Sequence, residues 1–167
     1  MTPRIVILEL TKIEAMHLAG LVTQFTELLE ESAGESRPSD PAVERLVPDA
    51  YGDDSEASEE FRSLTQRELL ERRSMDAATV LADLHDVVGL DADDIVPEAL
   101  ESTGSIRLDA EGLQAWLRTL AAVRLVLASR LGISDEHDHV DDDPRFGIYD
   151  WLGYRLEGLV TAADDSL

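Results

Sequence analysis

The sequence predicts a mainly α-helical domain, a helical bundle that carries a minor two-stranded antiparallel β ribbon. Long segments in which apolar residues recur every three or four positions predict the helices. Two short segments rich in Ile, Val and Leu, each followed by a helix-start pattern, predict the ribbon. A length of 167 residues fits one core, so we expect residues 1–167 to form a single helical domain.

The two predicted strands run from Arg4 to Leu10 and from Ile106 to Leu108. The first stops at Thr11, where Thr11 and Glu14 form a capping box that opens a helix, and the second stops at Asp109, a helix N-cap. Because both segments precede a helix in the same way, we expect them to pair with each other and to lie against the helices.

Helix-start and helix-stop residues divide the rest of the chain. The expected helices run from Thr11 to Gly34, from Asp40-Pro41 to Pro48, from Ser55 through Leu64, from a second capping box at Thr65–Glu68 to Val88, from Asp109 to Leu131 before the stop at Gly132, and onward from Asp143-Pro144. Acidic, glycine-containing sequences near residues 89–105 and 133–143 predict flexible connectors.

The helix before Gly132 has an apolar pattern on more than one side. Leu113 to Leu131 supply a broad apolar face, and Leu125 and Val126 lie on the opposite side. Such a pattern indicates a central helix, covered either by the rest of the bundle or by another copy of the chain.

Charge and composition restrict the function. Thirty-six acids against fourteen bases give a net charge of −22, which repels nucleic acid and anionic lipid and favours a basic partner. The absence of cysteine excludes disulfides, thiolate nucleophiles and thiol-based redox sensing. The apolar run near the amino terminus is too short for a signal peptide or a membrane span, so we expect a cytoplasmic protein.

The segment SDEHDHVDDDP, residues 134–144, contains ligand types that metals use. No register places acids and glycine where a calcium-binding loop needs them. His137 and His139, with Asp135 or Asp141, remain an alternative zinc or transition-metal site, although Asp, His and Glu in succession form poor strands. We interpret the segment as a solvated acidic linker and expect no metal or other cofactor.

The chain lacks the sequence marks of the commonest hydrolases, nucleotide hydrolases and dinucleotide enzymes. We therefore expect a non-enzymatic protein. A metal-dependent enzyme built on His137 and His139 and an acidic decoy that mimics nucleic acid remain the alternatives.

Two groups of residues are candidates for partner binding. Trp151 and Tyr154, in YDWLGY, lie three residues apart beside the apolar face of the last helix, either at the edge of the core or on a partner or dimer surface. Arg62, Arg72 and Arg73, together with Arg67, form a local basic island that pairs with nearby acids or contacts a partner.

Several phrases of the sequence together resemble a known family. DPAVERLVPDAY, EFRSLT, WLRTLAAVRLVLASRLGI and YDWLGYRLEGLV are similar, in this order, to an uncharacterised domain-of-unknown-function family of high-GC Gram-positive bacteria. Some members of that family are labelled AosR-type oxidative-stress transcriptional regulators. The resemblance covers most of the chain, and its motifs are structural in character, with no catalytic residue to transfer.

The resemblance implies a regulatory protein connected with transcription, but two features of this sequence depart from a simple regulator. Without cysteine it has no thiol switch, and its charge opposes direct nucleic-acid binding. We therefore expect it to contact a protein partner that is basic or transcription-related, such as a sigma factor, and to form a homodimer through its carboxy-terminal helices.

Overall fold

The computed structural model describes residues 4–33, 40–47, 55–89, 97–133 and 143–165, with residues 55–63 and 145 described by their backbone alone. The elements follow one another as β1 (Val6–Thr11), α1 (Lys12–Ala33), α2 (Pro41–Leu46), α3 (Ser55–Val88), α4 (Pro97–Leu100), β2 (Thr103–Leu108), α5 (Ala110–Leu131), a 3₁₀ turn (Pro144–Phe146) and α6 (Gly147–Asp165). The predicted mainly α fold with a minor two-stranded ribbon is confirmed.

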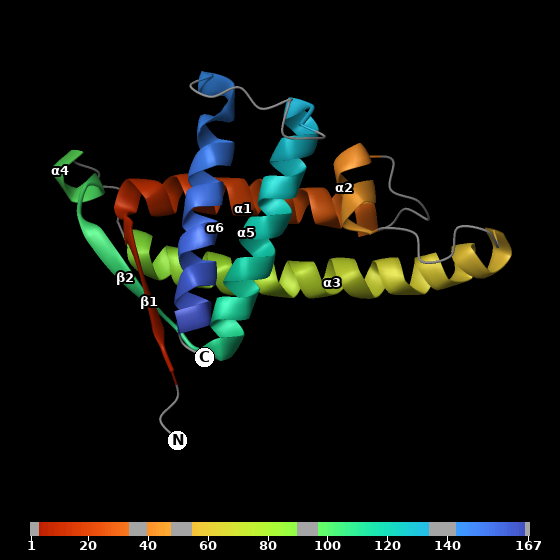
Figure 1. The fold of residues 1–167 in the computed structure, drawn as a ribbon, viewed down its shortest axis with the longest axis horizontal. Coiled ribbons are helices and arrows are strands. Elements are labelled where there is room, and N and C mark those ends of the chain that lie inside the picture. Colours follow the sequence, from red (N-terminus) through yellow and green to blue (C-terminus); the bar gives the residue numbers. More distant parts are fainter. Residues whose placement is uncertain (1–3, 34–39, 48–54, 90–96, 134–142, 166–167) are drawn as a thin grey trace.

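The long helices form two pairs, and one pair crosses the other (Figure 1). Helices α1 and α3 run side by side, and α5 and α6 cross them at a steep angle. Helix α3 packs on α1 and on α5, which places it at the centre of the contacts, while α6 packs chiefly on α5. The β ribbon lies at the end of the α1–α3 pair where α1 begins.

The ribbon is antiparallel, and its register places five apolar side chains on one face, four of them buried. Val6 pairs with Leu108 and Leu8 pairs with Ile106. Leu8, Leu10, Ile106 and Leu108 are buried in the main core, whereas Ile7 on the other face is exposed. Alternation of buried and exposed side chains is what a ribbon covered by helices on one face requires.

The predicted caps at four helix ends are confirmed. Thr11 and Glu14 exchange hydrogen bonds in a capping box, with the Thr11 N–H donating to Glu14 Oε2 at 2.9 Å. Asp40 and Asp109 each accept a backbone N–H in the first turn of α2 and α5, and Gly132 ends α5 in the left-handed conformation at φ 75°.

Several element boundaries differ from the sequence prediction. The two helices expected on either side of Thr65 are one continuous helix, α3, so the predicted start at Thr65 is wrong. No glycine or proline interrupts residues 55–88, and a capping-box sequence caps only where the backbone leaves helical geometry.

The second strand begins at Thr103 rather than Ile106, and the first begins at Val6 rather than Arg4. Pairing with β1 supplies backbone partners to Thr103–Ser105, which their own composition does not favour as a strand. The connector predicted over residues 89–105 is shorter, because β2 begins at Thr103. Part of the connector forms α4. The last helix is preceded by a 3₁₀ turn over Pro144–Phe146, where an α-helix beginning at Asp143-Pro144 was expected.

Candidate functional site

Trp151 and Tyr154 of α6 differ in burial. Tyr154 is 72% exposed and Trp151 is half-buried, packed against the main core. Leu152 and Leu159, on the inner side, are buried. The structure thus keeps Tyr154 free of the core and places Trp151 at its edge.

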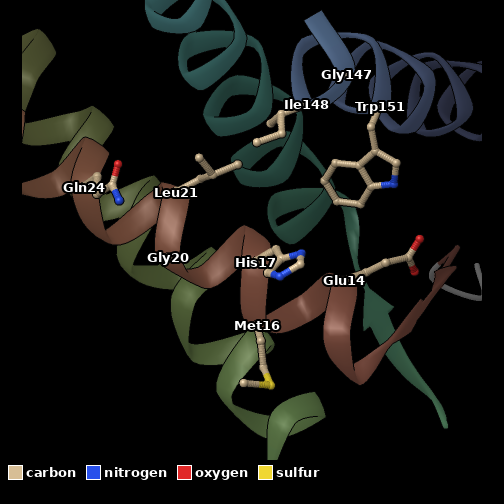
Figure 2. Close-up of a pocket in the computed structure, with 9 residues that line it drawn as sticks. All are labelled: Glu14, Met16, His17, Gly20, Leu21, Gln24, Gly147, Ile148 and Trp151. Atoms are coloured by element: carbon tan, nitrogen blue, oxygen red, sulfur yellow. The ribbon is translucent and has the colours of Figure 1, made fainter. Parts of the chain in front are cut away.

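Trp151 borders an apolar groove between α1 and α6 (Figure 2). The groove has a volume of about 490 Å³. In the view of Figure 2, Trp151 and Ile148 from α6 face Leu21 and His17 from α1. Ile148 is 54% exposed and His17 is also exposed, so this end of the groove opens to solvent.

A second hollow continues the groove along α1 toward α5. It has a volume of about 300 Å³ and shares Leu21 and Gln24 with the first. Val126 and Leu127 of α5 line its far wall, and neither is fully buried. The two hollows together form what we call the α1 groove, which runs beside α1 from Glu14 to Glu31.

Glu14 closes one end of the α1 groove through three interactions. Its Oε1 accepts a hydrogen bond from Arg155 Nη2 at 2.8 Å, and its Oε2 accepts the Thr11 N–H. The indole nitrogen of Trp151 points toward the same carboxylate (Figure 2). Partial burial alone raises the pKa of Glu14, but the Thr11 N–H, the Arg155 guanidinium and Trp151 together hold it below its usual range.

Arg155 joins α6 to two other elements. Besides its ion pair with Glu14, its Nη1 donates to the backbone carbonyl of Glu9 in β1, and its guanidinium lies 5.9 Å from the centre of the Trp151 ring. One side chain of α6 therefore contacts the ribbon, the first turn of α1 and the aromatic edge of the groove.

A second arginine explains the glycine in YDWLGY. Arg124 of α5 lies 4.0 Å above the Tyr149 ring and donates from Nε to the Tyr149 carbonyl. A Cβ at Gly153 would lie 2.9 Å from Arg124 Nη2. Gly153 thus leaves the space in which Arg124 reaches the backbone of α6.

The basic island is only partly solvent-exposed. Arg72 is exposed, and Arg73 is half-buried with its Nε lacking a hydrogen-bond partner among the described residues. Burial lowers the pKa of Arg73, Asp76 opposes that shift, and Arg118 adds to it. The side chain of Arg62 lies outside the described residues.

An acidic residue beside the island, Asp76, pairs with an arginine outside the island, so intramolecular pairing of the island itself stays a prediction. Asp76 forms a two-bond ion pair with Arg118 of α5, at 2.9 and 3.2 Å. The polar hollow of about 790 Å³ at this place is lined by charges of both signs, among which Asp83 accepts the indole N–H of Trp116. These charges link α3 to α5.

Comparison with known proteins decides the family. The model of the family described as "Domain of unknown function (DUF2017)" matches residues 1–163. The chain belongs to the DUF2017 family. No curated protein and no solved structure was found to match this DUF2017 chain.

The candidate metal ligands of the DUF2017 chain, His137 and His139, lie outside the described residues, as do Pro48–Tyr51 of the family-like motifs. Within the described ranges, no group of three or more His, Asp or Glu side chains is arranged to hold a metal ion. The helices of these ranges include none that is long and apolar enough to cross a membrane.

Sequence reasoning missed both arginine contacts of α6 and the α1 groove. Trp151 and Arg155 are four residues apart on one helix, and this spacing was the available signal for the contact between their side chains. The groove carries no such signal, because it depends on how α1 and the α5–α6 pair cross.

Proposed function

We propose that this DUF2017 protein is a non-enzymatic, cytoplasmic regulatory protein that acts by binding a basic, transcription-related protein. The observation that carries the proposal is the exposed aromatic surface of α6, formed by Tyr154 and the half-buried Trp151 beside the α1 groove. Amphipathic aromatic side chains at a surface hollow are typical of protein interfaces.

The charge of the chain favours a basic protein over nucleic acid. A net charge of −22 repels phosphate, so direct binding to DNA is opposed by electrostatic repulsion. A basic protein surface is instead attracted. The sequence resemblance to members labelled AosR-type oxidative-stress transcriptional regulators, from high-GC Gram-positive bacteria, supports a connection with transcription. The cysteine-free sequence requires that any response to oxidants comes from the partner or from another chemistry.

The experiment compares partner capture with folding. The full chain is immobilised and exposed to native extract, and captured proteins are identified by mass spectrometry for wild type, Tyr154→Ala and a Trp151→Ala/Tyr154→Ala double variant. We expect capture of a basic transcription protein to fall about tenfold or more in Tyr154→Ala, while its free energy of unfolding changes by less than about 0.5 kcal/mol.

Leu64→Ala is the matched control, because Leu64 is 70% exposed on α3 and lies away from α6. It is expected to leave capture unchanged. Equal capture by wild type and the double variant, or loss of capture only in proportion to loss of folded protein, would reject the α6 surface as the binding site. The predicted homodimer uses the same helix, so sedimentation of each variant is measured in parallel.

A further inference from the structure

We propose that the α1 groove binds a basic amphipathic helix of the partner protein. The inference rests on the proposed function and specifies the partner segment and its place. The apolar floor of the groove, its length and the charges along its rim each support this occupant.

The floor is apolar at the Glu14 end, and at the far end it combines apolar side chains with polar ones. Trp151 and Ile148 supply it at the Glu14 end, Leu21 lies where the two hollows meet, and Val126 and Leu127 supply it at the far end. A helix with apolar residues at i, i+3, i+4 and i+7 presents a continuous apolar stripe of this kind.

The length of the groove suits a helix of several turns. It follows α1 from Glu14 to Glu31, which are 17 residues apart on one helix. At a rise of about 1.5 Å per residue this is roughly 26 Å, the length of a partner helix of about four to five turns.

The charges on the rim favour a basic helix. Glu27 and Glu31 line the α5 end of the groove and form no ion pair within the described part of the chain. Arg130, the one arginine among the described lining residues, is already bound by Asp40 through two hydrogen bonds of 2.8 and 2.6 Å. The last turn of α1 contains no basic residue.

The same charges disfavour a second copy of this chain as the occupant. Each copy carries −22, so apposing two copies at an acidic rim brings like charges together. Lysines or arginines flanking the apolar stripe of a partner helix instead pair with Glu27 and Glu31, and they accelerate association in a salt-dependent way.

The test uses the full chain and a synthetic 18-residue peptide of Leu and Lys with its leucines at helical spacing. Binding is measured by fluorescence anisotropy of the labelled peptide at about 150 mM salt, a concentration that screens nonspecific attraction. A peptide of the same composition with scrambled leucines and a Leu/Glu peptide with helical spacing serve as probes of amphipathicity and charge. We expect only the helical Leu/Lys peptide to bind.

Matched variants locate the binding. Ile148→Asp and Glu27→Gln/Glu31→Gln are each expected to weaken binding about tenfold, because they place a charge in the floor and remove the rim charges. Leu64→Asp and Glu30→Gln/Glu68→Gln carry the same changes at exposed positions that do not line the groove, and are expected to bind within about twofold of wild type.

Equal binding by wild type and both groove variants would overturn the proposal, since the peptide would then adhere by charge alone. The proposal would also be overturned if the peptide does not bind, the wild-type protein is a dimer and Ile148→Asp dissociates that dimer. The groove would then bind a second copy of the chain. If the peptide fails but Tyr154→Ala still loses the captured partner, the helix inference falls and the proposed function stands. If the peptide binds in the groove but partner capture is the same for wild type and the Trp151→Ala/Tyr154→Ala double variant, the proposed function is rejected instead.

Discussion

The two tryptophans lie on neighbouring helices in opposite surroundings. Trp116 of α5 is completely buried, and its indole N–H donates to Asp83 of α3 at 2.9 Å. Trp151 of α6 is half-buried beside an open groove and contacts charged groups. The same side chain therefore serves as core in one helix and as the edge of a surface hollow in the next.

The difference extends to the whole helices. Eight residues of α5 are buried, as against two in α6. Helix α6 compensates through Arg124 and Arg155, which connect it to α5, β1 and α1. We conclude that α5 is held by apolar burial along its length, whereas α6 adds the contacts of Arg124 and Arg155 to a smaller buried face around Leu152 and Leu159.

The largest expected effect tests the burial of α5. Trp116→Ala removes a fully buried ring and leaves Asp83 without its donor, so we expect a loss of about 3–5 kcal/mol in the free energy of unfolding. Trp151→Ala is expected to cost about 1–2 kcal/mol, because its side chain is only partly buried. Urea denaturation followed by circular dichroism measures both.

If Trp116→Ala does not fold, Trp116→Phe and Trp151→Phe make the same comparison with smaller changes. Trp116→Phe should still be the more costly of the two, since Asp83 loses the indole donor, whereas Glu14 beside Trp151 keeps the Thr11 N–H and Arg155. Equal costs at the two positions would show that α6 is held by burial as firmly as α5.

An intermediate effect tests the Arg124 contact of α6. Arg124→Ala removes a cation–π contact and a hydrogen bond to the Tyr149 carbonyl, and we expect it to cost about 1–2 kcal/mol. In that variant the space beside Gly153 is empty, so Gly153→Ala is expected to stabilise it by up to about 1 kcal/mol through helix propensity.

In the wild-type background the same Gly153→Ala change forces Arg124 to move, and the gain should vanish or reverse. Thermal denaturation of the four members of this double-mutant cycle provides the measurement. Identical effects of Gly153→Ala in both backgrounds would mean that Arg124 does not need the glycine.

The smallest effect tests the ion pair of Glu14 with Arg155. Glu14→Gln retains a capping-box residue but removes the charge, and we expect a loss of about 1 kcal/mol at pH 7. The folded-state pKa of Glu14 is lowered, so its contribution is fully present above the unfolded value of about 4.3 and is lost as the pH falls through the folded value.

The stability difference between wild type and Glu14→Gln should therefore shrink as the pH is lowered from 7 toward about 3. Glu30→Gln is the control, since Glu30 is exposed on the same helix and lacks an ion pair in the described part of the chain. The same series of measurements on this variant gives the baseline for the comparison. A difference for Glu14→Gln that stays constant over this range would locate the effect in the cap alone.

Local signals predicted what depends on a few neighbouring residues. The capping box at Thr11, the N-caps at Asp40 and Asp109 and the stop at Gly132 could be predicted because their chemistry is contained within one turn. The same reasoning was wrong at Thr65, where an identical type of sequence lies inside a continuous helix. No glycine or proline breaks the helix near Thr65, so α3 continues through it.

The candidate site was predicted only in part. The pattern of α6 separated Tyr154 from the buried Leu152, and the exposure of Tyr154 agrees with it. The contact of Arg155 with Glu14 joins residues 141 positions apart, and Arg124 of α5 contacts Tyr149 of the neighbouring helix α6. Contacts of this kind depend on helix placement, which periodicity does not encode.

The position of Arg155 has a consequence for solubility. Both strands of a two-stranded ribbon are edge strands, and Ile7 of β1 and the preceding Ile5 are exposed. Such an edge is a template for adding a strand from another molecule. By occupying the outward carbonyl of Glu9 with a charged side chain, Arg155 blocks that addition, so the residue that fastens α6 also protects the ribbon from edge-to-edge aggregation.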